Sequence, residues 1–121
     1  MKREIKFRAW DSETKEMSYD FLSKNWLKVC IESPYVEVMQ YTGLKDRNGK
    51  EIYEGDIFPP GERTLGEITI VSYDSKQARY KAVPLSLYKA NAGNGGWTGF
   101  DVNSYSEVIG SVYDNPDLLE G

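Results

Sequence analysis

Residues 41–58, YTGLKDRNGKEIYEGDIF, carry the clearest turn signal in this chain. At their centre stands Asn48-Gly49, the pair that most favours a type I′ hairpin turn, because both central residues of that turn need positive φ. The sequence therefore predicts a β-hairpin with a two-residue loop. Its register would set two cross-strand pairs, Leu44 with Tyr53 and Asp46 with Glu51.

Gly55 interrupts the second arm of this hairpin. A glycine inside a strand is typical of a bulge or a sharp bend, so we expect the strand to break there and restart at residues 56–58. Pro59-Pro60-Gly61 then ends the segment, because proline cannot donate to a strand ladder.

The N-terminal ten residues, MKREIKFRAW, alternate in the manner of a half-buried strand. Apolar residues (Ile5, Phe7 and Ala9) point to one face, and the other face carries Lys6, Arg8 and Trp10. Residues 11–13 predict a turn, and a second strand over residues 15–19 would return antiparallel to the first.

Residues 20–32, DFLSKNWLKVCIE, are compatible with a helix or with an irregular loop holding buried aromatics. Helical spacing relates Leu22, Trp26, Val29 and Cys30, and Asp20 is a candidate N-cap. We interpret Cys30 as a small core residue rather than a nucleophile. After Pro34, residues 35–41 alternate again and predict a strand.

The rest of the chain shows further strand and turn signals. Strands are expected over residues 66–73, 78–83 and 107–113, a glycine-rich loop over residues 90–99, and one helical turn starting at Asn115-Pro116. Short strands with frequent turn residues favour a small antiparallel barrel or sandwich and leave no room for long helices.

Composition narrows the function classes. The 121 residues carry a net charge of −4, contain no histidine and hold a single cysteine. Histidine-based catalytic triads and imidazole metal sites are therefore excluded within one chain, as are an intrachain disulfide and a tetrahedral thiolate zinc site. No long apolar run predicts a membrane span, and we expect a cytoplasmic protein.

Three carboxylates close in sequence could converge on Mg²⁺, namely Glu51, Glu54 and Asp56. We favour a structural role instead, because Asp side chains often bond nearby backbone N–H groups in turns; Asp46 is expected to support the hairpin in this way. The glycines near Trp97 do not fit a phosphate loop, since no Gly-Lys-Ser/Thr opens a helix there. We interpret Trp97 as an anchor of that loop.

The stretch from Lys76 to Lys89 contains four basic residues and no acidic residue. It predicts a surface that could bind single-stranded nucleic acid through charge and base stacking. Its candidate binding residues are Arg79, Lys81, Tyr88, Lys89 and Trp97. The alternative is an ordinary solvated strand face, which the acidic balance of the whole chain favours.

Three stretches together resemble the YopX family, small proteins carried by bacteriophages and prophages. They are REIKFRAWD at residues 3–11 with Met17 following, QYTGLKDRNGKEIYEGDIF at 40–58, and SEVIGSVYDNPDLL at 106–119. Ser111 departs from the asparagine more usual in the family, and residues 20–38 and 59–100 show no resemblance. The resemblance implies a mostly β fold with an SH3-like barrel and no known activity, so no site residue is carried over.

We therefore expect a single mainly β unit with short helices only. Residues 1–40 would form a smaller N-terminal β element, and residues 41–121 a small antiparallel SH3-like barrel. The expected function is that of a non-enzymatic phage or prophage accessory protein, without cofactor or metal, in the cytoplasm of the bacterial host. It would bind an unknown host or phage protein, with self-assembly as a further option, and nucleic-acid binding is the alternative.

Overall fold

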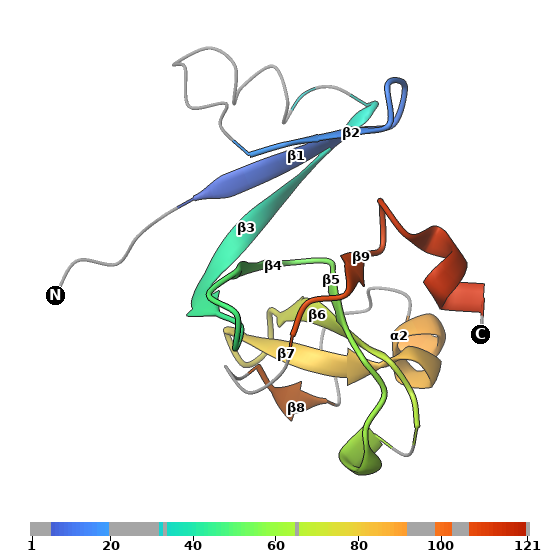
Figure 1. Ribbon diagram of the computed structural model, residues 1–121. Coiled ribbons are helices and arrows are strands. Elements are labelled where there is room, and N and C mark those ends of the chain that lie inside the picture. The colour runs from blue at the N-terminus through green and yellow to red at the C-terminus, as the bar shows by residue number, and fades with distance from the viewer. Residues whose placement is uncertain are drawn as a thin grey trace, which may run out of the picture.

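Two antiparallel sheets form the framework of the described chain (Figure 1). The structure, a computed structural model, describes residues 6–19, 32, 34–64, 66–91, 99–102 and 107–120. The elements in order are β1 (Phe7–Asp11), β2 (Glu16–Ser18), β3 (Val36–Lys45), β4 (Glu51–Tyr53), β5 (Asp56–Phe58), η1 (Glu62–Thr64), β6 (Thr69–Asp74), β7 (Arg79–Pro84), α2 (Leu85–Asn91), β8 (Phe100–Asp101), β9 (Gly110–Ser111) and η2 (Pro116–Glu120). The expected mainly β class with short helices is confirmed.

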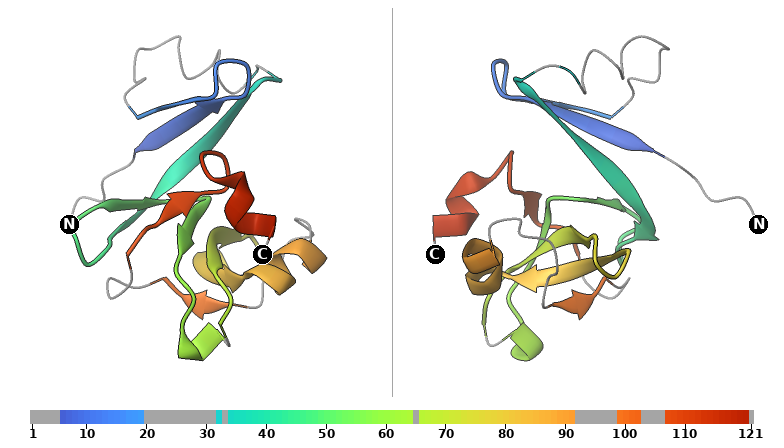
Figure 2. Two further views of the ribbon diagram at one scale, coloured as in Figure 1. Left: turned by 45° about the vertical axis from the view of Figure 1, so that its right-hand side comes forward. Right: turned by 180° about the vertical axis from the view of Figure 1, so that it is seen from behind.

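In the described part of the chain the strands order as β2-β1-β3-β4, the N-terminal sheet, and β8-β7-β6-β5-β9, the C-terminal sheet. The second order is compatible with an SH3-like barrel, and that finer assignment stays a prediction. Figure 2 shows β1 and β2 standing off from the C-terminal sheet, with β3 running from one sheet to the other. The boundary expected at residue 40 thus falls inside one continuous strand.

The larger apolar core is built from the C-terminal sheet together with β4. Buried Ile52 of β4 packs with Phe58, Val71 and Ala82 of the C-terminal sheet, and partly buried aromatic and aliphatic side chains cover them. The outer part of the N-terminal sheet, β1 and the start of β3, has a much smaller apolar cluster, in which buried Ala9 is surrounded by Phe7, Val36 and Val38. As expected from the alternation of residues 5–9, Phe7 and Ala9 share that face.

The Asn48-Gly49 hairpin forms, but the two-residue type I′ loop predicted for it is wrong. Gly49 has φ of +82°, whereas Asn48 does not take positive φ. The N–H of Asp46 donates to the carbonyl of Lys50 at 2.8 Å, and that of Gly49 donates to the carbonyl of Asp46 at 3.0 Å. The loop therefore has three residues, 47–49, with glycine in the left-handed position of a bulge.

This longer loop also corrects the predicted register. Lys45 lies opposite Glu51, and after a bulge Tyr41 lies opposite Tyr53. The cause is the Asp46 carboxylate, whose Oδ1 accepts the N–H groups of Asn48 and Lys50, both at 2.9 Å. The predicted support of the hairpin by Asp46 is confirmed, and the same support excludes the tighter turn.

Gly55 breaks the strand as expected, with φ of +87° between β4 and β5. Its N–H donates to the carbonyl of Val71 at 2.8 Å, and its carbonyl accepts the N–H of Val112 at 2.9 Å. One bend thus joins the hairpin, β6 and the C-terminal segment.

The remaining local predictions had mixed outcomes. The strands expected over residues 15–19, 66–73 and 78–83 correspond to β2, β6 and β7, and the C-terminal turn is η2. The strand expected over residues 107–113 shrinks to β9, because the chain folds back and the Asn115 side chain accepts the N–H of Ser111. Helix α2 was not predicted, and the expected helix or loop over residues 20–31, with Cys30, lies outside the described residues.

Candidate functional site

Arg8 is the first unexpected feature at the junction of the two sheets. Strand alternation placed it on the outer face of β1, yet it is 1% exposed. Its Nη2 lies 2.9 Å from Asp56 Oδ1 and donates to the carbonyl of Glu54, also at 2.9 Å. The guanidinium carbon lies 4.9 Å from the ring centroid of Tyr53, within cation–π range. The second face of β1, on which the alternation placed Arg8, is therefore also covered at this residue, because it meets the hairpin.

The three carboxylates considered as a metal site face different partners. Asp56 binds Arg8 and accepts the N–H of Tyr53 at 2.8 Å, and Glu51 forms an ion pair with Lys6. Glu54 Oε1 accepts the N–H of Gln40 at 2.9 Å. Among the residues that the structure describes, no group of three metal-ligating side chains comes together.

A cleft opens where the N-terminal sheet meets the C-terminal sheet, and we call it the junction cleft. Its volume is about 330 Å³. Its wall comes from β3, the bend at Glu54-Gly55, β6, α2 and the segment after β9. The residues lining it are Glu37, Val38, Met39, Glu54, Gly55, Val71, Ser72, Tyr73, Ser75, Tyr88, Val112 and Tyr113.

Gly55 is part of the wall of this cleft. A Cβ at this position would lie 3.5 Å from Met39 Sδ, Val112 Cγ2 and Tyr113 Cε2, which is ordinary van der Waals contact. The positive φ of Gly55, rather than a lack of space, makes the position unfavourable for other residues. The glycine that bends the hairpin therefore also lines the cleft.

The chemistry of the junction cleft is acidic and aromatic. Burial raises the pKa of Glu54, although the Gln40 N–H and the charge of Arg8 partly offset this effect. Burial, together with the nearby Glu37, Tyr88 and Glu54, raises the pKa of Tyr113 to about 12. Burial is the largest cause of both shifts, and for Tyr113 the neighbouring acidic groups add to it.

A second hollow of about 420 Å³ adjoins the first, and we call it the Trp10 groove. It is lined by Trp10, Ser12, Lys15, Tyr113, Asp114 and Pro116. The rings of Trp10 and Tyr113 lie 6.0 Å apart, so they form one aromatic wall. Tyr113 lines both hollows and is the wall between them.

The candidate residues of the basic stretch do not gather into one surface. Lys81 is 5% exposed, and its Nζ lies 2.8 Å from Asp74 Oδ2. Arg79 pairs with Asp101 at 2.8 Å, whereas Lys89 is exposed on α2. Tyr88 lines the junction cleft beside acids, and Trp97 lies outside the described residues. Lys81 is therefore not available to bind phosphate, although nucleic-acid binding by the remaining residues stays a prediction.

Sequence reasoning missed Glu37, Tyr73 and Tyr113 as candidate site residues. They come from three separate segments, and each alone resembles an ordinary exposed strand or turn residue. The one available signal was Gly55 beside Glu54, which marks a place where backbone and a carboxylate share a bend.

No helix within the described ranges is both long and apolar enough to cross a lipid bilayer.

Comparison with known proteins finds one protein family that matches nearly the whole chain. The sequence profile described as YopX protein matches residues 6–120. The crystal structure of protein EF1440 from Enterococcus faecalis is similar, with a TM-score of 0.59 and 24% identity over 98% of this chain and 99% of that one. Protein YopX from Bacillus subtilis gives a TM-score of 0.50 and 22% identity, covering 96% of each chain. At these identities the two structures show a shared fold. Curated proteins gave no significant match.

Proposed function

Because this chain belongs to the YopX protein family, we propose that it is a phage or prophage accessory protein that works without catalysis, by binding another protein. The proposed binding site is the pair of hollows that share Tyr113, the junction cleft and the Trp10 groove. The proposed place of action is the cytoplasm of the bacterial host.

The observation that carries this proposal is the adjacency of the two hollows. Aromatic side chains in the buried centre of a protein interface often supply much of its binding energy. Two neighbouring hollows with a common wall suit an extended segment, which can place successive side chains into each of them. Tyr73, at 43% exposure, stands at the rim of the first hollow.

The non-enzymatic part of the proposal rests on the contacts of the carboxylates. Asp56 and Glu51 are held in ion pairs with Arg8 and Lys6, and such groups serve folding. Nucleic acid is not favoured as the partner, because the two basic residues of β7 already form ion pairs. Arg79 pairs with Asp101, and Lys81 pairs with Asp74.

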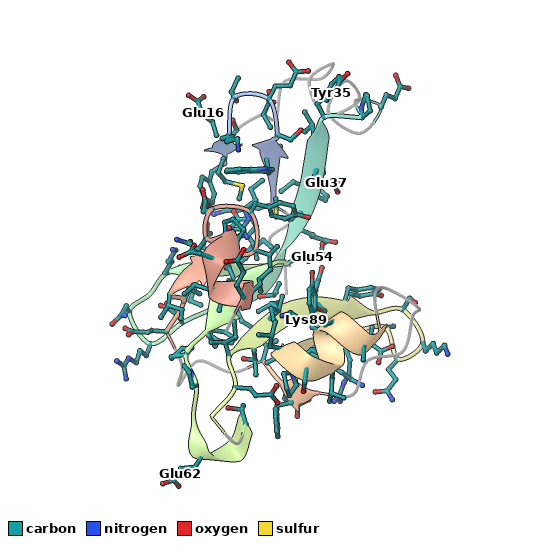
Figure 3. All side chains as sticks on the ribbon, turned by 90° about the vertical axis from the view of Figure 1, so that its right-hand side faces the viewer. Glu16, Tyr35, Glu37, Glu54, Glu62 and Lys89 are labelled. Carbon is teal, nitrogen blue, oxygen red and sulfur yellow. The ribbon has the colours of Figure 1, made fainter. Side chains whose placement is uncertain are left out.

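A pull-down from phage-infected or lysogenic cells, read by mass spectrometry, tests the proposal. The tagged chain should recover a stable partner, and Tyr73→Ala should lose it. Tyr35→Ala is the matched control, because Tyr35 is another exposed tyrosine (54%) and lies at the far end of the N-terminal sheet (Figure 3). Recovery of the same partner with wild-type and Tyr73→Ala protein would overturn the proposed site.

Self-association is measured separately by light scattering after size-exclusion chromatography. Edge strands β2 and β8 could each pair with another chain, since one side of each is unpaired among the described strands. A monomer in solution that also recovers no partner from infected cells would contradict the binding role altogether.

A further inference from the structure

The size of the junction cleft suits one side chain of a partner. Sites for small ligands and cofactors occupy about 300–1,000 Å³, and the cleft, at about 330 Å³, lies at the low end of that range. This space is sufficient for a single long side chain.

Two carboxylates face this space without a cation. Glu37 projects from β3 and Glu54 from the bend before β5, and Figure 3 shows them on the same side of the molecule. Within the described residues, no lysine or arginine lies within ion-pair distance of either carboxylate. Glu37 is exposed and Glu54 is half-buried. Desolvation destabilises the charged form of the Glu54 carboxylate, and a bound cation would reduce that penalty.

Three tyrosine rings, those of Tyr73, Tyr88 and Tyr113, complete the wall. The face of an aromatic ring carries partial negative charge and attracts an ammonium or guanidinium group. The methylene part of a lysine or arginine side chain packs well on the same rings, because it is apolar. The carboxylates and the ring faces therefore suit the charged end of a lysine or arginine side chain, and the rings also suit its apolar methylene part.

The acidic groups around the cleft favour positive charge inside it, as a cationic side chain requires. The pKa of the Tyr113 phenol is raised by burial and by Glu37, Tyr88 and Glu54, and the offsetting cation is Arg8, which is already bound to Asp56. Lys89 stands on α2 but does not line the cleft.

We infer that the junction cleft binds the cationic side chain of a lysine or arginine presented by the partner protein. This inference rests on the proposed function and names the chemistry that its site recognises. An acidic side chain would be repelled by Glu37 and Glu54. An apolar one would bury Glu54 further without a partner for its charge.

Short peptides test the inference directly on the whole chain. The probes are acetyl-Ala-Lys-Ala-amide and its arginine counterpart, with norleucine and glutamate versions as controls, titrated into ¹⁵N-labelled protein. The two cationic peptides should shift the amide signals of Gly55, Ser72 and Tyr73, with a dissociation constant on the order of millimolar, as expected of one anchored side chain. Added salt should weaken the binding.

Isosteric variants identify the groups responsible. Glu54→Gln keeps the oxygen that accepts the Gln40 N–H and removes only the charge, so the fold should persist. We expect Glu54→Gln to reduce the affinity for the lysine peptide about tenfold, which is the usual effect of losing one charge-assisted hydrogen bond. Glu37→Gln should reduce the affinity as well. Glu62→Gln is the control, because Glu62 lies at the opposite end of the molecule (Figure 3).

Equal shifts with the glutamate or norleucine peptide, or unchanged affinity in Glu54→Gln, would overturn the inference. Shifts with spermidine but with neither cationic peptide would overturn it as well, because the ligand would then be a free polyamine. These outcomes are separate from the pull-down. A partner that is lost with Tyr73→Ala but retained with Glu54→Gln and Glu37→Gln would leave the proposed function standing and remove only the cationic anchor.

Discussion

Different interactions stabilise the two sheets of this protein. In the C-terminal sheet, Ile57, Ile70 and Val83 are fully buried, and a cluster around Val71 and Phe58 adds to them. The outer part of the N-terminal sheet, β1 and the start of β3, has one buried residue in its apolar cluster, Ala9. Burial of large aliphatic side chains therefore stabilises the C-terminal sheet together with Ile52 of β4, and contributes little to this outer part.

The N-terminal sheet compensates with ties to the rest of the molecule. Buried Arg8 binds Asp56 and the Glu54 carbonyl, Trp10 packs near Tyr113, and β3 continues into the hairpin. The part of the sheet with the small apolar cluster is thus held against the rest of the molecule by these contacts, although the buried Nε of Arg8 has no hydrogen-bond partner within the described residues. The junction cleft lies where these ties meet, so its shape depends on them.

Removing the ion pair between Arg8 and Asp56 should have the largest effect on the stability of the protein. Arg8→Met leaves the Asp56 carboxylate buried without a counter-charge, and we expect the free energy of unfolding to fall by about 3–5 kcal/mol. Denaturant melts provide the measurement. Arg47→Met is the control, because its ion pair with Glu107 is exposed and should be worth less than about 1 kcal/mol. Similar losses in the two variants would show that the N-terminal sheet does not rely on this tie.

A pair of valines compares the two cores directly. Val71→Ala removes two methyl groups at a site that is 1% exposed and should cost about 2 kcal/mol. Val38→Ala changes a half-buried residue of the N-terminal sheet and should cost less than about 1 kcal/mol. The measurement is again the denaturant midpoint, and equal costs would mean that the thin core contributes more than its burial indicates.

The hairpin that connects the two regions offers a backbone test. Gly49→Val forces a β-branched residue into positive φ and should cost about 1–3 kcal/mol. Glu51→Gln weakens only a part-exposed ion pair with Lys6, so its cost should stay below about 1 kcal/mol. If thermal or denaturant melts gave the opposite order, the turn would not depend on backbone strain.

The smallest expected effect concerns pH and Asp46, which ties the hairpin to the C-terminal segment. Burial raises the pKa of its carboxyl group, but the N–H groups of Val108, Lys50 and Asn48 outweigh this and hold it below its usual 3.8. A lowered pKa means that the stabilisation is present above the unfolded pKa and is lost as the pH falls through the folded pKa.

Asp46→Asn should therefore reduce stability by about 1 kcal/mol near neutral pH, because one acceptor of backbone N–H groups is lost. The difference from wild type should shrink below the ordinary pKa of aspartate. Urea melts at several pH values measure it, and a difference that grew toward low pH would have the wrong sign for this account.

Much of the fold followed from local pattern. The alternation around Phe7 and Ala9, the turn at Asn48-Gly49 and the break at Gly55 were all predictable, because each depends on the conformational preference of a few neighbouring residues. Even there, one further local contact accompanies a different outcome: the carboxylate of Asp46 accepts the N–H groups of Asn48 and Lys50 in a three-residue loop, where the Asn-Gly pair had predicted a two-residue loop.

The candidate site was hardly predictable, and Tyr88 is its one lining residue among those proposed from the sequence. Period-two alternation states which residues share a face but not what that face meets, so Arg8 and Lys81 were placed opposite the apolar face of their strands, and both are buried against Asp56 and Asp74. The sequence by itself determined where strands, bends and turns lie. Only the tertiary structure decided which charges are buried and which remain uncompensated in the cleft, because desolvation and charge pairing depend on segments that meet only after folding.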